Sequence, residues 1–405
     1  EDLQNITVLK GPAAAALYGS RASNGAVIIT TKSGRKGQKN EVMVNPTVTF
    51  SNILKLPQFQ NSYGQGYLTG FDADGNPEYY NDPIENWSWG PPFTGELQDW
   101  GQEINGVRQQ KPYSAQPKNA RIFFELGKMI NNTVSFAGGG DKTAFYLSLN
   151  ALNSDGVYPT NNDDYNRYNA RFNGSAQLSN KITASIGISY SRVNSNLVQG
   201  GQGSGSVYDN LLQTPRDIPI DKLGDLDNPY NGYGFLNERG EEVYGFYGGY
   251  TVSPYFLLEN YRNENDVDRV TGNFTITWQP LAWLSVVERL GADVYSDRRR
   301  FKYPKFTYYP ADEATGNYSR TNVQSEVGQY RENNFNVSEV VHDLMITGRT
   351  KLGADLSASL MIGHNMRQRT QSILDASTNE SFGLIVPGWY SLDNSNGPLY
   401  NYNEY

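Results

Sequence analysis

The feature that most constrains this chain is a strict alternation of apolar and polar side chains over long segments. Between positions 168 and 178 the even positions are apolar or small. The polar residues between them are Asn169, Arg171, Asn173, Ser175 and Gln177. The alternation resumes after a two-residue turn at 179–180 and continues to Tyr190. Because side chains of a β-strand point alternately to opposite faces, this pattern predicts an antiparallel hairpin with one apolar face.

Similar alternation recurs along the rest of the chain, in segments of about ten residues or more, which is the length that crosses a bilayer at a tilt. We predict nine strands, at 42–53, 131–138, 143–153, 166–178, 181–193, 267–279, 283–297, 334–348 and 354–370. Composition agrees, since the chain has 29 Tyr, 41 Gly, no Cys and 38% hydrophobic residues. Only alternate residues of such a strand face lipid, so a membrane barrel keeps a low mean hydropathy, here −0.61.

The connections between the predicted strands are very unequal in length. Short turns are expected near positions 140, 180, 280 and 352. Long Gly-, Asn-, Tyr- and Pro-rich segments occupy about 54–130, 194–266 and 298–333. Short turns at one end and long loops at the other are typical of outer-membrane β-barrels. We therefore expect the short turns to share one rim, the long segments to share the other, and Phe172, Ile186 and Phe274 to face lipid.

The N-terminal segment NITVLKGPAAAALYGSRASNGAVIITTKSG, residues 5–34, differs from the barrel pattern. It predicts a strand, a turn at Gly11-Pro12, a short Ala-rich helix and a second strand at 26–32. Gly19 and Gly25 are expected where the backbone reverses with a positive φ. The pieces VLKGP, ALYGSRASNG and VIITTKSG resemble, in this order, the C-terminal end of the plug domain of TonB-dependent outer-membrane transporters. The Ala-rich form is similar to the SusC/RagA branch found in Bacteroidetes-type bacteria.

This resemblance implies an all-β membrane protein: part of an antiparallel outer-membrane β-barrel of about 22 strands with an internal plug domain. Residues 1–38 would be the C-terminal end of the plug and a linker, and 39–405 the N-terminal portion of the barrel with long extracellular loops. The structural plug motif would comprise Lys10, Gly11, Pro12, Tyr18, Gly19, Arg21 and Gly25. The segment that contacts TonB, and the remaining strands, are expected outside this sequence, which begins at Glu1 without a signal peptide.

The family's function implies TonB-dependent import of a large nutrient, an oligosaccharide or a peptide, across the outer membrane. A SusD-type surface lipoprotein would cover the long loops, and TonB, ExbB and ExbD would supply energy through the upstream region. Trp87, Trp89 and Trp100 are the candidate contacts for a ligand or this partner, although packing within their own loop is the commoner role of a tryptophan. Two alternatives stay open: a transporter-like barrel that serves as a scaffold in an outer-membrane complex, and a siderophore receptor.

Catalytic chemistry finds no support in the sequence. The two histidines, His342 and His364, are not spaced as metal ligands or as part of a catalytic triad, and no phosphate-binding loop occurs. We expect no cofactor, and a net charge of −8 disfavours nucleic acid as a partner. One residue departs from the barrel pattern, because Glu288 falls on the apolar row of its strand. Either a local bulge turns it inward or it contacts a partner protein.

Overall fold

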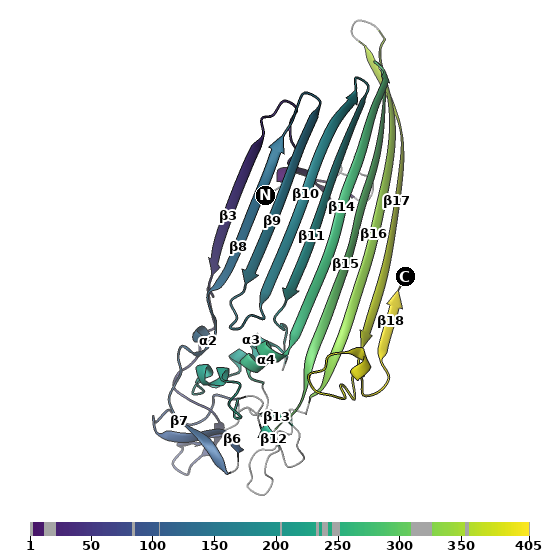
Figure 1. Cartoon of the computed structure of the whole chain (residues 1–405). Helices are drawn as coiled ribbons and strands as arrows, with labels where there is room; N and C mark the ends of the chain where they lie inside the picture. The colour runs from purple at the N-terminus through teal and green to yellow at the C-terminus, as the bar shows by residue number, and fades with distance from the viewer. Residues whose placement is uncertain are drawn as a thin grey trace.

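The dominant feature of the fold is one large antiparallel sheet, seen in a computed structural model of the whole chain (Figure 1). The structure describes residues 3–11, 22–82, 86–104, 106–202, 205–231, 235–236, 242–244, 252–308, 326–352 and 356–404. Among these residues, none of the helices has the length and apolar character needed to cross a membrane.

Ten strands follow one another across the sheet in chain order, each antiparallel to its neighbours. They are β3 (Glu41–Ser51), β8 (Gly127–Gly138), β9 (Thr143–Asp155), β10 (Asp164–Ser179), β11 (Ile182–Asn196), β14 (Arg262–Leu281), β15 (Leu284–Tyr308), β16 (Glu326–Lys351), β17 (Ser357–Ser377) and β18 (Tyr400–Glu404). A small two-stranded element, β12 (Phe235–Leu236) with β13 (Glu242–Tyr244), joins the end of β15.

The nine strands predicted from alternation are confirmed, and most extend further than predicted. The structure also contains β18, which pairs with Ile373–Ser377 of β17. The nine strands predicted from the sequence do not include β18, which lies in the Asn- and Tyr-rich C-terminal stretch. Polar Asn and Tyr residues mask the alternation there, whereas backbone pairing with an existing edge does not require an apolar face.

The two ends of the sheet are unequal, as the sequence predicts, but the long segment expected at 298–333 is shorter than predicted. Residues 298–308 belong to β15, 326–333 belong to β16, and 309–325 lie outside the described residues. The short turns at 139–142, 180–181 and 282–283 lie at one end, the upper end in Figure 1, where β16 ends and β17 begins. The described parts of the long connections 52–126, 197–261 and 378–399 lie at the opposite end, together with the labelled helices. We call these ends the short-turn rim and the long-loop rim.

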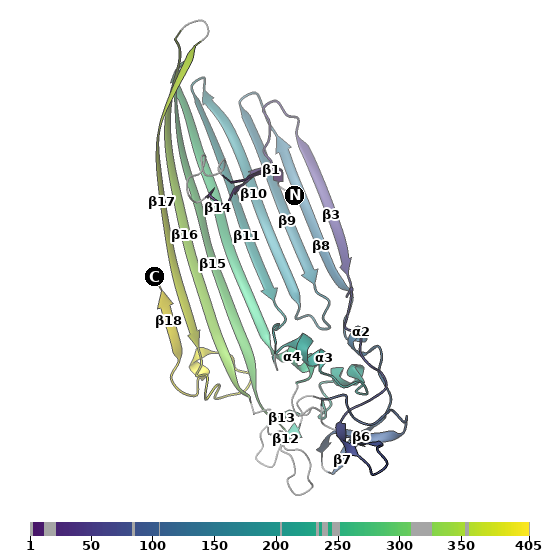
Figure 2. The same cartoon turned by 180° about the vertical axis from the view of Figure 1, so that it is seen from behind.

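A separate hairpin, β1 (Leu3–Leu9) with β2 (Ala26–Thr31), lies against one face of the sheet, in front of it in Figure 2. The Asn173 side-chain amide of β10 donates 2.6 Å to the backbone carbonyl of Lys32, at the exit from the hairpin. Further along, the Lys36 ammonium donates 2.9 Å to the Gln177 side chain. We call this face of the sheet the inner face, and the opposite face the outer face.

The register of the paired strands extends the assignment of inner and outer faces from β10 to its neighbours. Asn173 pairs with Gly187, Gly187 with Asn273, and Asn273 with Gly291. On β10, β11 and β14 to β17 the odd positions therefore lie on the inner face and the even positions on the outer face. The outer face carries Phe172, Ile186 and Phe274, whose exposed fractions are 37%, 43% and 39%.

Glu288 lies on the outer face in regular register, paired with Ile276 on one side and Leu344 on the other. The bulge that would turn it inward is absent from this part of β15. Its carboxylate instead contacts His342 Nε2 at 2.5 Å, and the His342 ring packs against His364 with ring centroids 5.7 Å apart. The polar side chains on this apolar row therefore satisfy one another.

The first prediction concerns the outer face. Replacing Phe274 with Arg is expected to destabilise the folded protein by about 2–4 kcal/mol, because Phe274 lies in the middle of the apolar row from Val270 to Trp278. The matched control is Thr275→Arg, one residue along the same strand on the polar inner face. Urea titration of the full-length protein in lipid vesicles would measure both. Equal destabilisation by the two variants would contradict the assignment of faces.

Candidate functional site

The two longest loops fold together into one layer at the long-loop rim. The first loop, 52–126, contains β4 (Tyr67–Phe71), β5 (Pro77–Tyr80), β6 (Leu97–Ile104), β7 (Val107–Pro112) and α2 (Asn119–Ile122). The second, 197–261, contains α3 (Val207–Leu212), η2 (Ile220–Gly224) and α4 (Pro254–Asn260). The side chains of Ser206 and Ser253 cap α3 and α4 by accepting from backbone N–H groups of the first turn.

This loop layer has its own hydrophobic core. Its buried members come from both loops and from the end of β15: Trp100, Phe123, Val207, Leu211, Ile218, Ile220, Leu223, Val252, Phe256, Leu257, Leu258 and Phe306. The Asn119 side chain joins the two loops, because its carbonyl accepts 3.0 Å from Ile220 N and its amide donates to Ile218 O. A core of this size compensates the conformational entropy lost when such long loops become ordered.

A buried ion pair ties the same two loops together. Lys111 of β7 contacts Asp217 of the second loop, and the two side chains are only 6% and 1% exposed. The second carboxylate oxygen of Asp217 accepts 2.9 Å from the backbone N–H of Gln65. Tyr113 is fully buried beside this pair, and its hydroxyl donates 2.7 Å to Pro91 O. Burial, with the nearby negative charge of Asp217, raises the pKa of Tyr113, so the phenol stays a neutral donor.

Other ionisable groups of the loop layer respond to burial in the same way. Burial, followed by the charges of Asp221 and Glu125, raises the pKa of Tyr255 to about 12. Asp163, in the connection between β9 and β10, has its carboxyl pKa raised mainly by burial. Burial lowers the pKa of Arg216, whose guanidinium bonds to Gln60 O and to the Asn61 side chain of the first loop. Arg216, which lies in the second loop, therefore connects it to the first loop.

The exposed part of the loop layer carries an aromatic surface. Tyr67 packs against Trp87 and Tyr80, with ring centroids 6.2 and 5.5 Å away. Trp87 and Trp89 are 55% and 72% exposed. Both are held by the backbone, since Gly66 N donates 3.1 Å to Trp87 O and Trp89 N donates 3.1 Å to Gly66 O. The layer thus presents exposed aromatic rings on a fixed backbone.

At the short-turn rim, the segment that follows β2 is fixed to the wall of the sheet. Gly37 N donates 3.0 Å to Gly140 O, and Gly139 N donates 3.1 Å to Gln38 O. Gly34 passes so close to β9 that an added Cβ would lie 2.3 Å from Phe145 O, so only glycine fits. The linker from the hairpin is therefore joined by its backbone to the first hairpin of the sheet.

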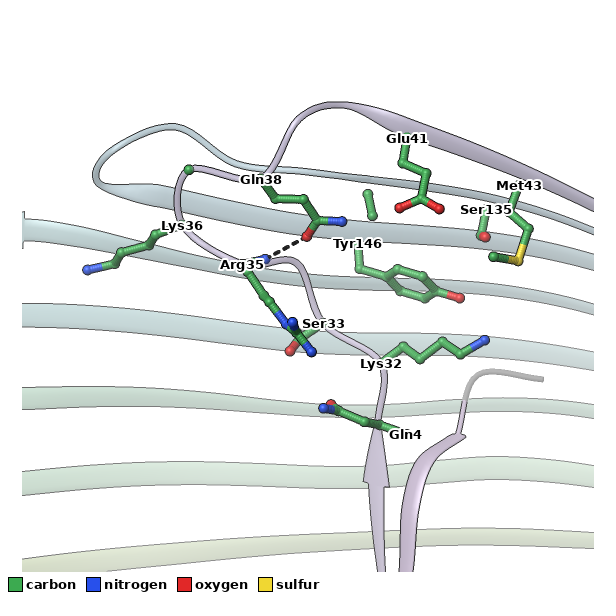
Figure 3. Close-up of a pocket in the computed structure, with 12 residues that line it drawn as sticks. Gln4, Lys32, Ser33, Arg35, Lys36, Gln38, Glu41, Met43, Ser135 and Tyr146 are labelled. Carbon is green, nitrogen blue, oxygen red and sulfur yellow. Dashed lines mark hydrogen bonds between the residues drawn. The ribbon is translucent and has the colours of Figure 1, made fainter.

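A cavity of about 580 Å³ lies between this linker and strands β3, β8 and β9 (Figure 3). The linker contributes Lys32, Arg35 and Lys36 to its lining, and the wall contributes Glu41 and Tyr146. In Figure 3 the Lys32 side chain extends along the wall beside Tyr146, while Lys36 points away from it. Lys32 and Arg35 against Glu41 therefore leave the cavity with one positive charge in excess.

The inner face of the sheet is also rich in cations. On the odd positions of β10 to β17 the acidic residues are five: Asp293, Asp297, Glu339, Asp343 and Asp375. The basic residues on these positions are eleven: Arg167, Arg171, Arg269, Arg289, Arg299, Lys305, Arg331, Arg349, Lys351, Arg367 and Arg369. The outer face of the same strands carries Asp164, Glu264, Asp266, Asp268, Glu288, Glu326 and Glu332 against Arg192, Arg262, Arg298, Arg300 and Lys302.

Each of these five acidic residues is paired with one arginine. Arg269–Asp293, Arg331–Asp375 and Arg367–Glu339 each have two hydrogen bonds of 2.5–2.9 Å. The other two pairs join Arg299 to Asp297 and Arg289 to Asp343. Among the described residues, no group of His, Cys, Asp or Glu is arranged to hold a metal ion.

Comparison with known proteins finds TonB-dependent receptors among the similar sequences. No protein-family model matches the chain. The TonB-dependent receptor SusC of Bacteroides thetaiotaomicron is 30% identical over 176 residues, which cover 42% of this chain and 14% of SusC. TonB-dependent receptor P3 of Formosa agariphila is 26% identical over 268 residues, 62% of this chain and 23% of that receptor.

The solved structures show the same fold. The structure of the RagAB peptide importer in the "open-open" state matches 100% of this chain and 42% of the solved chain, with a TM-score of 0.65 and 17% identity. The chain is thus similar in sequence to TonB-dependent receptors, and its fold matches part of the RagAB importer. It spans less than half of the solved relative. TonB-dependent receptors are outer-membrane proteins, and in such barrels one face of the sheet contacts lipid while the other lines the lumen.

The residues singled out from the sequence lie in different environments in the structure. Gly11 and Gly25 adopt positive φ values of 55° and 111°, and a positive φ was expected for Gly25. Lys10 directly precedes Gly11 in the chain. Pro12, Tyr18, Gly19 and Arg21 lie outside the described residues. Trp87 and Trp89 are exposed on the aromatic surface, but Trp100 is 3% exposed and belongs to the loop core. Trp100 therefore packs within its own loop layer and presents no surface to a ligand or partner.

The buried ion pair generates the second prediction. Lys111→Met leaves the Asp217 carboxylate buried without its cation and is expected to destabilise the loop layer by about 3–5 kcal/mol. Hydrogen exchange of residues 205–231 in the full-length receptor would measure the change. Removing an exposed partner, as in Arg299→Met on the wall, is the control and should leave exchange in the loop layer unchanged. Unchanged exchange in Lys111→Met would show that the pair does not hold the loops.

Proposed function

We propose that this receptor imports a large nutrient, an oligosaccharide or a peptide, across the outer membrane, with energy supplied by TonB, ExbB and ExbD. In this proposal residues 1–38 are the end of the internal plug and its linker, and 39–405 are the N-terminal portion of the barrel. The similarity to SusC and to RagA, which is described as part of a peptide importer, supports transport and not catalysis.

One observation carries the proposal further: the ordered loop layer with its exposed aromatic surface. Two loops that share a core and a buried ion pair form a rigid platform at the long-loop rim. Exposed Tyr and Trp residues on a rigid frame are typical of surfaces that bind a protein or stack on sugar rings. We infer that a SusD-type surface lipoprotein covers this platform and encloses the nutrient between itself and the lumen.

Isolation of the native complex tests the proposed function. The full-length receptor, tagged and extracted in mild detergent, should carry a stoichiometric surface lipoprotein and a bound oligosaccharide or peptide, both identified by mass spectrometry. Uptake of that ligand by cells should stop when TonB is deleted. Co-purification of assembly or secretion proteins without a lipoprotein would contradict import and favour the scaffold role. Retrieval of an iron chelate would favour the siderophore receptor.

The third prediction concerns the aromatic surface. Replacing Trp87 and Trp89 together with Ala is expected to weaken lipoprotein binding by about 2 kcal/mol or more, since exposed aromatic anchors dominate such interfaces. The control is Trp389→Ala, because Trp389 is 53% exposed on a different long-loop connection, 378–399. Binding of the purified lipoprotein to receptor in nanodiscs measures the loss. A larger effect of Trp389→Ala would move the interface away from the first loop.

A further inference from the structure

The outer face of the sheet changes from apolar to polar at one level. On β15 its row of side chains is apolar from Leu284 to Val294, apart from Glu288. At about 3.4 Å per residue and a tilt of about 40°, this row rises about 25 Å, which is the height of the apolar band of an outer-membrane barrel. Toward the long-loop rim the same row continues with Ser296 and Arg298. In a barrel of this class, lipid headgroups lie at the level where the apolar row ends.

A cavity of about 570 Å³ lies on the outer face at this level, across β14 to β17, and we call it the outer hollow. Val270 and Val294, which pair with each other, line its apolar side and are 43% and 45% exposed. Because the polar side chains beside them are short, the surface is hollowed there. This polar lining follows the register, in which one row is formed by Asp268, Ser296, Asn336 and Ser372 and the next by Ser338 and Thr370.

The polar groups of the outer hollow are open to a ligand. One carboxylate oxygen of Asp268 accepts from the Tyr190 hydroxyl. The charged residues nearer the long-loop rim are paired with one another, as Arg300 is with Asp266. By contrast, within the described part of the chain no side-chain hydrogen bond is made by Ser296, Asn336, Ser338, Thr370 or Ser372.

The chemistry of the lining indicates what the outer hollow binds. Hydroxyl, amide and carboxylate groups are the hydrogen-bonding partners of sugar hydroxyls, and the two valines offer an apolar wall to an acyl chain. The lining has one carboxylate and neither Lys nor Arg, so it disfavours an anionic phosphate. Its volume is within the range of about 300–1,000 Å³ that is usual for ligand sites. We propose that the outer hollow binds a membrane glycolipid, with the sugar against the polar row and the acyl chain along Val270 and Val294.

The test uses the full-length receptor in nanodiscs of dioleoylphosphatidylcholine that contain equal small amounts of two probes. Glucosyl-dioleoylglycerol offers a sugar without phosphate, and dioleoylphosphatidylglycerol offers a phosphate without a sugar on the same acyl chains. Native mass spectrometry counts the probe molecules that stay bound to the released receptor. We expect the glucosyl lipid to be retained about fivefold more than phosphatidylglycerol, by the difference in hydrogen bonding and charge.

Variants locate the effect on the outer face. Ser338→Leu fills the outer hollow and is expected to abolish the preference for the glucosyl lipid. Thr370→Val keeps the volume but removes one hydroxyl, and should lower the preference about threefold. The matched control is Thr350→Val, on the outer face at the opposite end of β16, which should leave the preference unchanged. Thermal unfolding in the same nanodiscs checks that all three variants are folded.

Four results would overturn the inference. They are equal retention of the two probes, preference for phosphatidylglycerol, the same loss in Thr350→Val as in Thr370→Val, and a receptor dimer that Ser338→Leu dissociates, since protein would then cover the outer hollow. The inference does not depend on the proposed import function, which is decided separately by TonB-dependent uptake.

Discussion

The arrangement of this protein depends on the continuous antiparallel register of its sheet. Because side chains alternate, a slip of one residue in any strand would move its apolar row from the outer face to the inner face. The register is fixed at one end by two- to five-residue turns and in the middle by contacts with the hairpin, such as that between Asn173 and Lys32. This register decides which face of the sheet each charged side chain occupies.

The barrel portion could be predicted from sequence because its information is local. Alternation and turn length need only neighbouring residues, so nine strands and both rims could be predicted, whereas the polar edge strand β18 gave no such signal. Within the first long loop, Asp74-Gly75 and Asn105-Gly106 are hairpin signals that could have located β4–β5 and β6–β7. Gly75 and Gly106 indeed have φ values of 84° and 76°.

The contacts between the two long loops could not be predicted from the sequence. Lys111 and Asp217 are separated by 106 positions, and nothing near either residue indicates the other. The burial of Trp100 depends in the same way on α3 and α4, which come from the second loop. The net charge of the chain was also misleading, because it does not show that basic residues outnumber acidic residues on the inner face of β10, β11 and β14 to β17. The charges became informative only when the register assigned each side chain to the inner or the outer face.

The way in which the N-terminal hairpin is attached has a mechanical consequence. Leu3 pairs with Thr31 at one end of the β1–β2 ladder, and just beyond Thr31 the linker is fastened to the wall through Gly37 and Gln38. A pull on the chain before Leu3, against that fastening, would load the ladder at one end only. Its hydrogen bonds, each worth about 0.5–1.5 kcal/mol net, would then break one pair at a time and not all together. Little force would peel β1 away from β2, while the linker and the wall behind it stayed in place.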